Sequence, residues 1–312
     1  MNNYFKTALN SPLALFLYNR PNHAMHAVEA LKKCAESVAS DLFIFVDGPK
    51  QNASQEDLQK IAEVSAFAHK VTGFKTVQIT EQTRNIGLAN SILQGVSKVL
   101  QNYDTVIVIE DDIIVGEDFL NFLNLALNKY LHDPLVAGVS GYSFPISENQ
   151  PYFSRTGSCW GWGTYKRVWE PFIKSKDQLS ISNLKENELG LFNVYGNFYQ
   201  KMFEQHQQGL LQSWAVVFYL YYFSNEQYFL FSGANLIDNT GFDGSGSHRK
   251  KGNFLTDHNP IKRPLNNQFP NQIKENKEVR NKIVKLFQKG LSKPGIFRQM
   301  LHRFKSKLVK NI

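Results

Sequence analysis

Residues 106–114 read VIVIEDDII, so four β-branched apolar residues lead directly into Glu110, Asp111 and Asp112. A continuous apolar run of this kind is typical of a strand that is buried on both faces. Adjacent carboxylates at the end of such a strand repel one another unless a positive charge lies beside them. A divalent cation with oxygen ligands, Mn²⁺ or Mg²⁺, would supply that charge, and such ions commonly accompany phosphates. The alternative interpretation is an acidic surface loop after the strand.

The segments around this stretch alternate between apolar runs and helical periodicity. The runs predicted to be strands are 13–18, 42–46, 76–79, 106–109 and 135–139. The helices predicted between them span about 22–38, 54–71, 88–100 and 117–130, with Asn22 and Ser54 as N-caps. This order predicts an α/β fold with a mostly parallel sheet and helices on both faces. Ligands bind such sheets beyond the carboxyl ends of the strands, where Arg20, Asp47 and the acidic triplet are expected.

The net charge of the 312-residue chain is +8, but the excess is concentrated near the C-terminus. Residues 280–312 contain ten Lys/Arg and no Asp/Glu, which leaves 25 basic and 27 acidic residues elsewhere, a balance of −2. A nucleic-acid-binding fold carries a basic stripe on its main surface. The charge distribution therefore argues against nucleic acid as a partner.

The segment 280–312 combines apolar residues at helical spacing with Lys or Arg at most other positions. Such a basic amphipathic helix is typical of a tail that binds an anionic membrane surface. A helix packed on the body with a solvated basic face is the alternative. We therefore divide the chain into a domain at 1–250, a polar connector at 251–279 and this tail.

The expected location follows from the cysteines and from the absence of targeting signals. The chain has two cysteines, Cys34 and Cys159, which suits a reduced, cytoplasmic protein. We identify no secretory signal and no apolar run of about 18 residues that would form a membrane-spanning helix. Together with the basic tail, this predicts a peripheral protein on the inner face of the cytoplasmic membrane.

Two glycine-rich segments follow the alternating part. In residues 154–169, SRTGSCWGWGTYKRVW, the flat faces of Trp160 and Trp162 suit a wall against a sugar. The alternative is that both are core residues, as we expect for Trp169. Residues 238–248, DNTGFDGSGSH, suit a lid over a ligand, in which His248 could bind a metal or a phosphate. A plain surface loop is the alternative there.

Several of these motifs occur together in one known family. They are LFLYNRP at 15–21, FVDGP at 45–49, RNIGL at 84–88, VIEDDIIVGEDFL at 108–120, CWGWGTY at 159–165 and GFDGSGSH at 241–248. In this order they resemble bacterial nucleotide-sugar glycosyltransferases of the Rossmann-like GT-A fold, most closely those akin to animal N-acetylglucosaminyltransferase I. The resemblance covers roughly residues 11–250 and leaves out the C-terminal tail.

The resemblance implies a role in nucleotide binding for residues at the ends of the first strands. Arg20 would contact the nucleotide, and Asp47 would bind the edge of the uracil base. Asn85 and Gly87 would lie against the nucleotide or the sugar. The implied donor is therefore a UDP-sugar.

For the acidic triplet and the lid, the resemblance implies contacts with the metal, the sugar and the diphosphate. Asp111 would meet the ribose or sugar, and Asp112 would ligate the Mn²⁺ or Mg²⁺. Glu110 would contact the donor sugar. The segment around Ser245 and His248 would order over the diphosphate when the donor binds.

One position departs from the family pattern. Inverting relatives commonly carry an Asp after the Trp that matches Trp214, where it acts as general base, but Ala215 follows here. Inversion requires proton removal on the face opposite the leaving group, for which a carboxylate is the usual base. Asp243 is the best substitute, and Glu148 and Glu170 are weaker candidates. A retaining mechanism would need no such base.

These observations predict a metal-dependent glycosyltransferase that moves a sugar from a UDP-sugar to a hydroxyl of a surface glycan, which could be lipid-linked. A degenerate transferase that only binds glycan or membrane is one alternative, and Ala215 favours it. A sugar-nucleotide pyrophosphorylase is another. It would need a glycine-rich phosphate loop after the first strand, and NRPNHA at 19–24 contains no glycine.

Overall fold

The computed structural model describes residues 10–146, 148, 150–242, 255 and 268–291. Within these residues an eight-stranded sheet has the order β3-β2-β1-β4-β8-β6-β9-β7. Its strands are β1 Leu13–Leu17, β2 Asp41–Val46, β3 Thr76–Glu81, β4 Thr105–Glu110, β6 Val136–Ser140, β7 Tyr152–Ser154, β8 Trp162–Tyr165 and β9 Tyr228–Phe231. β7 and β8 run antiparallel to their neighbours, and the other neighbouring strands pair in parallel. The prediction of a mostly parallel sheet is confirmed.

The centre of the sheet forms where the sequence is most continuously apolar. Every residue of β1 is buried, as are Val106–Ile109 in β4 and all of β2 except its first residue. Strands buried on both faces need apolar side chains at successive positions, because neither face meets water. The five strands predicted from apolar runs are all present, with small changes at their ends.

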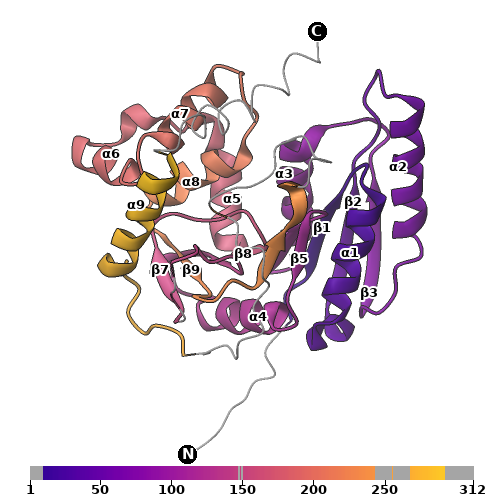
Figure 1. Ribbon diagram of the computed structural model, residues 1–312, viewed down its shortest axis with the longest axis horizontal. Helices are drawn as coiled ribbons and strands as arrows, with labels where there is room; N and C mark the ends of the chain where they lie inside the picture. Colours follow the sequence, from indigo (N-terminus) through magenta and orange to yellow (C-terminus); the bar gives the residue numbers. More distant parts are fainter. Residues whose placement is uncertain (1–9, 147, 149, 243–254, 256–267, 292–312) are drawn as a thin grey trace, which may run out of the picture.

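Helices cover both faces of the sheet, as predicted (Figure 1). One face carries α1 Pro21–Lys32, α2 Gln55–Ala68 and α4 Phe119–Lys129, and α1 and α4 both contact the 3₁₀ helix η1 Ala35–Ala39. The other face carries α3 Gly87–Leu100, α5 Lys166–Ser175 and α8 Trp214–Ser224, which contact one another. Two further helices, α6 Glu186–Phe192 and α7 Phe198–Gln207, lie beside α8 (Figure 1).

The helix starts follow capping rules, with one correction. Ser54 accepts a hydrogen bond from the Asp57 backbone N–H at 3.0 Å, so the predicted N-cap of α2 is confirmed. Asn22 is not the N-cap of α1, because Pro21 already occupies the first helical position and Arg20 is the cap residue. Proline favours that position, since its φ angle is helical and it has no N–H to leave unpaired.

A second, two-stranded sheet begins directly after the acidic triplet. Strand β5, Ile113–Val115, pairs antiparallel with β10, Ile237–Asn239. β10 continues into the 3₁₀ helix η4, Thr240–Phe242. The pairing therefore brings a segment from late in the chain to the end of β4.

Helix α9, Lys277–Leu291, packs against the body of the protein. Its Val279, Ile283 and Phe287 are buried, and the Phe287 ring lies 5.3 Å from that of Tyr195 and 6.1 Å from that of Phe144. Helix α9 crosses the predicted boundary at Arg280, and its apolar stripe completes the core. Residues 292–312, the rest of the predicted tail, lie outside the described residues.

Candidate functional site

The carboxyl ends of β1, β2 and β4 lie side by side, as the parallel order predicts. The Asp47 backbone N–H donates to Leu17 O at 3.0 Å, and the Asp111 N–H donates to Phe16 O at 3.1 Å. The last residues of β1 therefore hold both acidic strand ends. The structure thus brings the predicted residues Arg20, Asp47 and Asp111 to one edge of the sheet.

Arg20 joins the acidic residues at the end of β4. Its Nε donates to Asp111 Oδ2 at 3.2 Å, and its Nη2 donates to Asp112 Oδ2 at 3.1 Å. Nη2 also donates to Asp111 Oδ1, so the guanidinium grips Asp111 with two nitrogens. Paired hydrogen bonds between Arg and a carboxylate are among the stronger and more directional contacts in proteins.

Burial and the attraction between Arg20 and the carboxylates shift the pKa values in this cluster in opposite directions. Asp111 is 4% exposed, and its burial raises its pKa to about 7, although Arg20 opposes the shift and Asp112 adds to it. The nearby carboxylates raise the pKa of Arg20, against its burial, so the guanidinium stays charged. The cluster therefore depends on a positive charge, as the sequence predicts, and Arg20 supplies it here.

The segment after β10 closes over Asp112. The backbone N–H and the hydroxyl of Thr240 both donate to Asp112 O, at 2.8 and 3.1 Å. A Cβ at Gly241 would collide with the Asp112 carboxylate. Any larger residue would require the Asp112 side chain to move, so Gly241 lets the backbone approach the carboxylate that we predict to ligate a metal.

The donor chemistry of this edge suits a hard divalent cation. Glu110, Asp111 and Asp112 offer carboxylate oxygens, which Mg²⁺ and Mn²⁺ prefer, and Arg20 shows that the cluster accepts a cation. Within the described part of the chain, no three His, Cys, Asp or Glu side chains gather as a metal-binding group. A metal bound at Asp112 would therefore need further oxygen ligands from outside these side chains.

Asp47 forms a separate network that joins two of the sequence motifs. Its carboxylate accepts hydrogen bonds from the backbone N–H groups of Gly48, Ile86 and Gly87 at 2.9, 2.9 and 3.0 Å. Asn85 Nδ2 donates to the same carboxylate at 2.8 Å. Gly87, at φ +78°, begins α3, so Asp47 caps the N-terminus of that helix from a neighbouring strand.

This network changes the interpretation of Asp47. Burial raises its pKa, and the three backbone donors partly oppose the shift. With four hydrogen bonds already accepted, the carboxylate holds the RNIGL segment at 84–88 against the end of β2. Contact with a uracil edge stays a prediction, and it would require one of these donors to be exchanged.

The two tryptophans predicted to form a sugar wall have different environments. Trp162 is 1% exposed and stacks on Trp214 at 5.1 Å, so it is a core residue and its predicted contact with a sugar is wrong. Trp160 is partly exposed and lies 6.0 Å from the ring of Phe242, which follows the segment on Asp112. Gly161 has φ +56°, which breaks the alternation that would place both rings on one face.

Three predicted residues, Asp243, Ser245 and His248, lie outside the described residues. The other two carboxylates considered as general bases form ion pairs elsewhere. Glu148 pairs with Lys282 of α9 at 3.3 Å, and Glu170 lies 3.8 Å from Lys166 on α5.

The structure adds two residues that sequence reasoning missed. Tyr18 follows β1, and its burial, with Asp57 and Asp47 nearby, raises its pKa to about 12. Gln212 Oε1 lies 3.9 Å from the position that a Cβ atom would occupy on Gly87. The segment before α8 therefore reaches the start of α3. Tyr18 lies inside the quoted LFLYNRP motif, whereas nothing local marks Gln212.

Comparisons with known proteins find similarity among solved structures and none among family models or curated proteins. No protein-family model matches the chain, and no curated protein matches it. Among solved structures, it is similar to the crystal structure of S. aureus TarS, with 9% identity and a TM-score of 0.33. The match covers 52% of this chain and 29% of the TarS chain, so this chain spans less than a third of that protein.

The class of protein therefore rests on the topology and the site. The chain has a mixed α/β fold with an eight-stranded, mostly parallel sheet. Its acidic cluster follows β4 at the ligand edge of that sheet.

The capping role of Asp47 can be tested with Asp47→Asn. The amide would present an N–H₂ group where a backbone N–H now donates, so at least one buried donor would lose its acceptor. We expect a loss of about 1–3 kcal/mol in the free energy of unfolding, measured by urea denaturation. Asp177→Asn, at a side chain that is 85% exposed, should change stability by less than about 0.5 kcal/mol. Equal effects of the two changes would contradict the capping role.

Proposed function

We propose that the protein is a metal-dependent glycosyltransferase that uses a UDP-sugar and Mn²⁺ or Mg²⁺. The acceptor would be a hydroxyl of a surface glycan, including a lipid-linked one. The observation that carries the proposal is the acidic cluster at the end of β4 with Arg20 bound to it, at the carboxyl edge of an eight-stranded, mostly parallel sheet.

The residues of the cluster suit the departure of a nucleoside diphosphate. A bound divalent cation would neutralise the charge that develops on the diphosphate as the sugar–phosphate bond breaks. Asp112 would hold that cation, with Glu110 toward the sugar and Asp111 toward the ribose. Arg20 has to leave the two carboxylates for this, and the phosphates offer it an equivalent anionic partner.

The residue that activates the acceptor is proposed to be Asp243, which precedes Ser245 and His248 in the same segment. Ala215 occupies the position of the usual base in the first turn of α8. If the protein had no base and did not use a retaining mechanism, it would be a degenerate transferase that only binds glycan. Slow Mn²⁺-dependent hydrolysis of a UDP-sugar would distinguish the two, because a pure binding protein hydrolyses nothing.

Binding of UDP should require Mn²⁺ and Asp112. We expect isothermal titration to show UDP binding in the presence of Mn²⁺ and a loss of about tenfold or more in affinity with Asp112→Asn. Asp118→Asn, an exposed carboxylate on the same segment, should bind UDP normally. Absence of UDP binding by the unaltered protein with Mn²⁺ would contradict the proposed donor.

Arg20→Gln should change metal and nucleotide binding in opposite directions. Without the guanidinium, Asp111 and Asp112 would bind Mn²⁺ alone more tightly, by about tenfold, because no ion pair has to be broken. UDP with Mn²⁺ should bind more weakly by a similar factor, because Arg20 would no longer meet the diphosphate. Calorimetry measures both affinities. Lys33→Gln, at the other end of α1, is the control. A parallel loss of both affinities would contradict the exchange.

The proposed binding to an anionic membrane surface is argued from the outer face of α9. Val279, Ile283 and Phe287 face the core, whereas Lys277 and Lys285 are exposed. Their charges would attract anionic headgroups, each contributing about 1 kcal/mol near such a surface.

We expect the full chain to co-sediment with vesicles that contain phosphatidylglycerol, and not with pure phosphatidylcholine vesicles. The double change Lys277→Gln and Lys285→Gln should weaken this binding by about thirtyfold. Lys60→Gln with Lys70→Gln, near α2, is the matched control. Binding that is insensitive to the α9 changes would place the contact elsewhere.

A further inference from the structure

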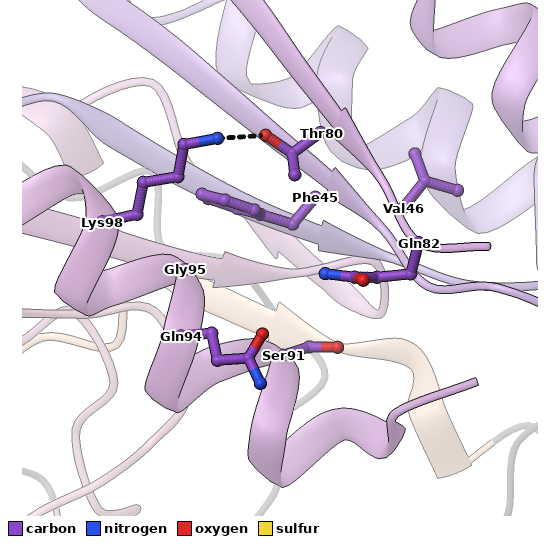
Figure 2. A pocket seen from close by; sticks show the side chains of 8 residues that line it. All are labelled: Phe45, Val46, Thr80, Gln82, Ser91, Gln94, Gly95 and Lys98. Atoms are coloured by element: carbon purple, nitrogen blue, oxygen red, sulfur yellow. Dashed lines mark hydrogen bonds between the residues drawn. The ribbon is translucent and has the colours of Figure 1, made fainter. Parts of the chain in front are cut away.

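A hollow of about 190 Å³ lies between α3 and β3, the strand at one edge of the large sheet (Figure 2). Phe16, Phe45 and Thr80 are register neighbours on β1, β2 and β3. A Cβ at Gly95 would lie 2.7 Å from the Phe16 ring and 3.1 Å from the Phe45 ring. Because Gly95 has no side chain, α3 packs closely on β1 and β2, and the hollow remains beside β3.

The lining of the hollow combines four neutral polar side chains with an apolar side. Figure 2 shows Gln82 extending from the end of β3 toward α3, where Gln94 and Ser91 lie. The ring of Phe45 forms an apolar side. At the other end, Lys98 Nζ donates to the Thr80 hydroxyl at 2.9 Å. Amides and hydroxyls can each donate and accept hydrogen bonds, so these walls suit a ligand with the same property.

Ser91 provides a second and independent sign of a ligand. Ser91 is 9% exposed, and within the described residues its hydroxyl oxygen, which is itself buried, has no hydrogen-bond partner. Ser97, on the same helix, shows the usual alternative, because its hydroxyl donates to Leu93 O at 2.7 Å. A buried hydroxyl without a partner costs about 1–3 kcal/mol, which a ligand in the hollow would recover once the hydroxyl rotates toward it.

The chemistry of the walls narrows the class of ligand. Of the eight described residues that line the hollow, none is acidic, which argues against a cation. The single charged residue, Lys98, already bonds to Thr80, which argues against a phosphate. The volume lies below the about 300 Å³ of a pocket for a drug-sized molecule, so one ring is the appropriate size. A neutral ring with several hydroxyls fits these conditions.

We propose that the hollow is a carbohydrate subsite that holds one neutral sugar unit of a glycan. This inference rests on the proposed function, because it assumes that the substrate of the protein is a glycan. Ser91 lies one helical turn after Gly87, whose N–H bonds to Asp47, so the subsite would lie next to the donor site and remain separate from it. A glycan chain held there would be tethered beside the transferase site.

The test uses the full chain with saturating UDP and Mn²⁺, so that the proposed donor site is occupied. Methyl glycosides of glucose, galactose and N-acetylglucosamine serve as probes in saturation-transfer NMR. We expect at least one to bind with a dissociation constant on the order of 1 mM. UDP binding is measured in the same samples, so a failure of the donor site is recorded separately from a failure of the subsite.

Two variants locate the binding. Gln94→Phe fills the mouth of the hollow and should abolish the signal, whereas Gln59→Phe, on an exposed position of α2, should retain it. Ser91→Ala should weaken the sugar by about fivefold without loss of stability, because the hydroxyl has no protein partner to lose. Ser97→Ala should destabilise the protein, since Trp169 Nε1 donates to that hydroxyl at 3.0 Å.

Three results would overturn the proposal. The first is that none of the glycosides binds. The second is that the signal survives Gln94→Phe. The third is that the glycoside binds only in matched samples without UDP, which would make the hollow part of the donor site.

Discussion

The contact between Arg20 and the two aspartates after β4 determines how this edge of the sheet can work. β1 and β4 pair in parallel with Phe16 opposite Glu110, so the backbone already places Arg20 near Asp111. Asp111 is nearly inaccessible to water, and its burial raises its pKa, while the charge of Arg20 opposes that shift. Arg20 contacts Asp111 and Asp112 through side-chain atoms alone, so these contacts could change without disturbing the strands.

Asp47 is also a buried carboxylate at a strand end, but its negative charge is balanced by hydrogen bonds from the backbone rather than by an arginine side chain. Its partners are mostly backbone N–H groups, and those of Ile86 and Gly87 form the start of α3. Releasing Asp47 would leave the N-terminus of that helix without an acceptor, whereas releasing Asp112 requires only a rotation of Arg20. Two acidic residues at neighbouring strand ends thus have different functions. Asp47 holds the start of α3 at this edge, whereas Asp111 and Asp112 are bound by the Arg20 side chain.

The sequence predicted the first half of the sheet because its strands are buried on both faces and are therefore continuously apolar. It did not predict β8, whose four residues WGTY carry neither a long apolar run nor a clean alternation, although this strand lies between β4 and β6. Arg20, Asp47 and the acidic triplet were found because strand order alone brings them together. Trp162 was misassigned because the left-handed turn at Gly161 is a backbone property that sequence spacing does not reveal. The docking of α9 depends on Phe144 and Tyr195, which are distant in sequence.

Helix α3 connects the acidic edge with the hollow beside β3. Its N-terminus is held by Asp47, and its middle is held against Phe16 and Phe45 by the missing side chain of Gly95. A helix constrained at two points cannot tilt to cover β3 without breaking one of the two contacts. The hollow is consequently a result of how α3 must pack, and it is present before any ligand binds. A preformed site requires little reorganisation on binding, so even the few polar groups around Ser91 can hold a weakly binding ring.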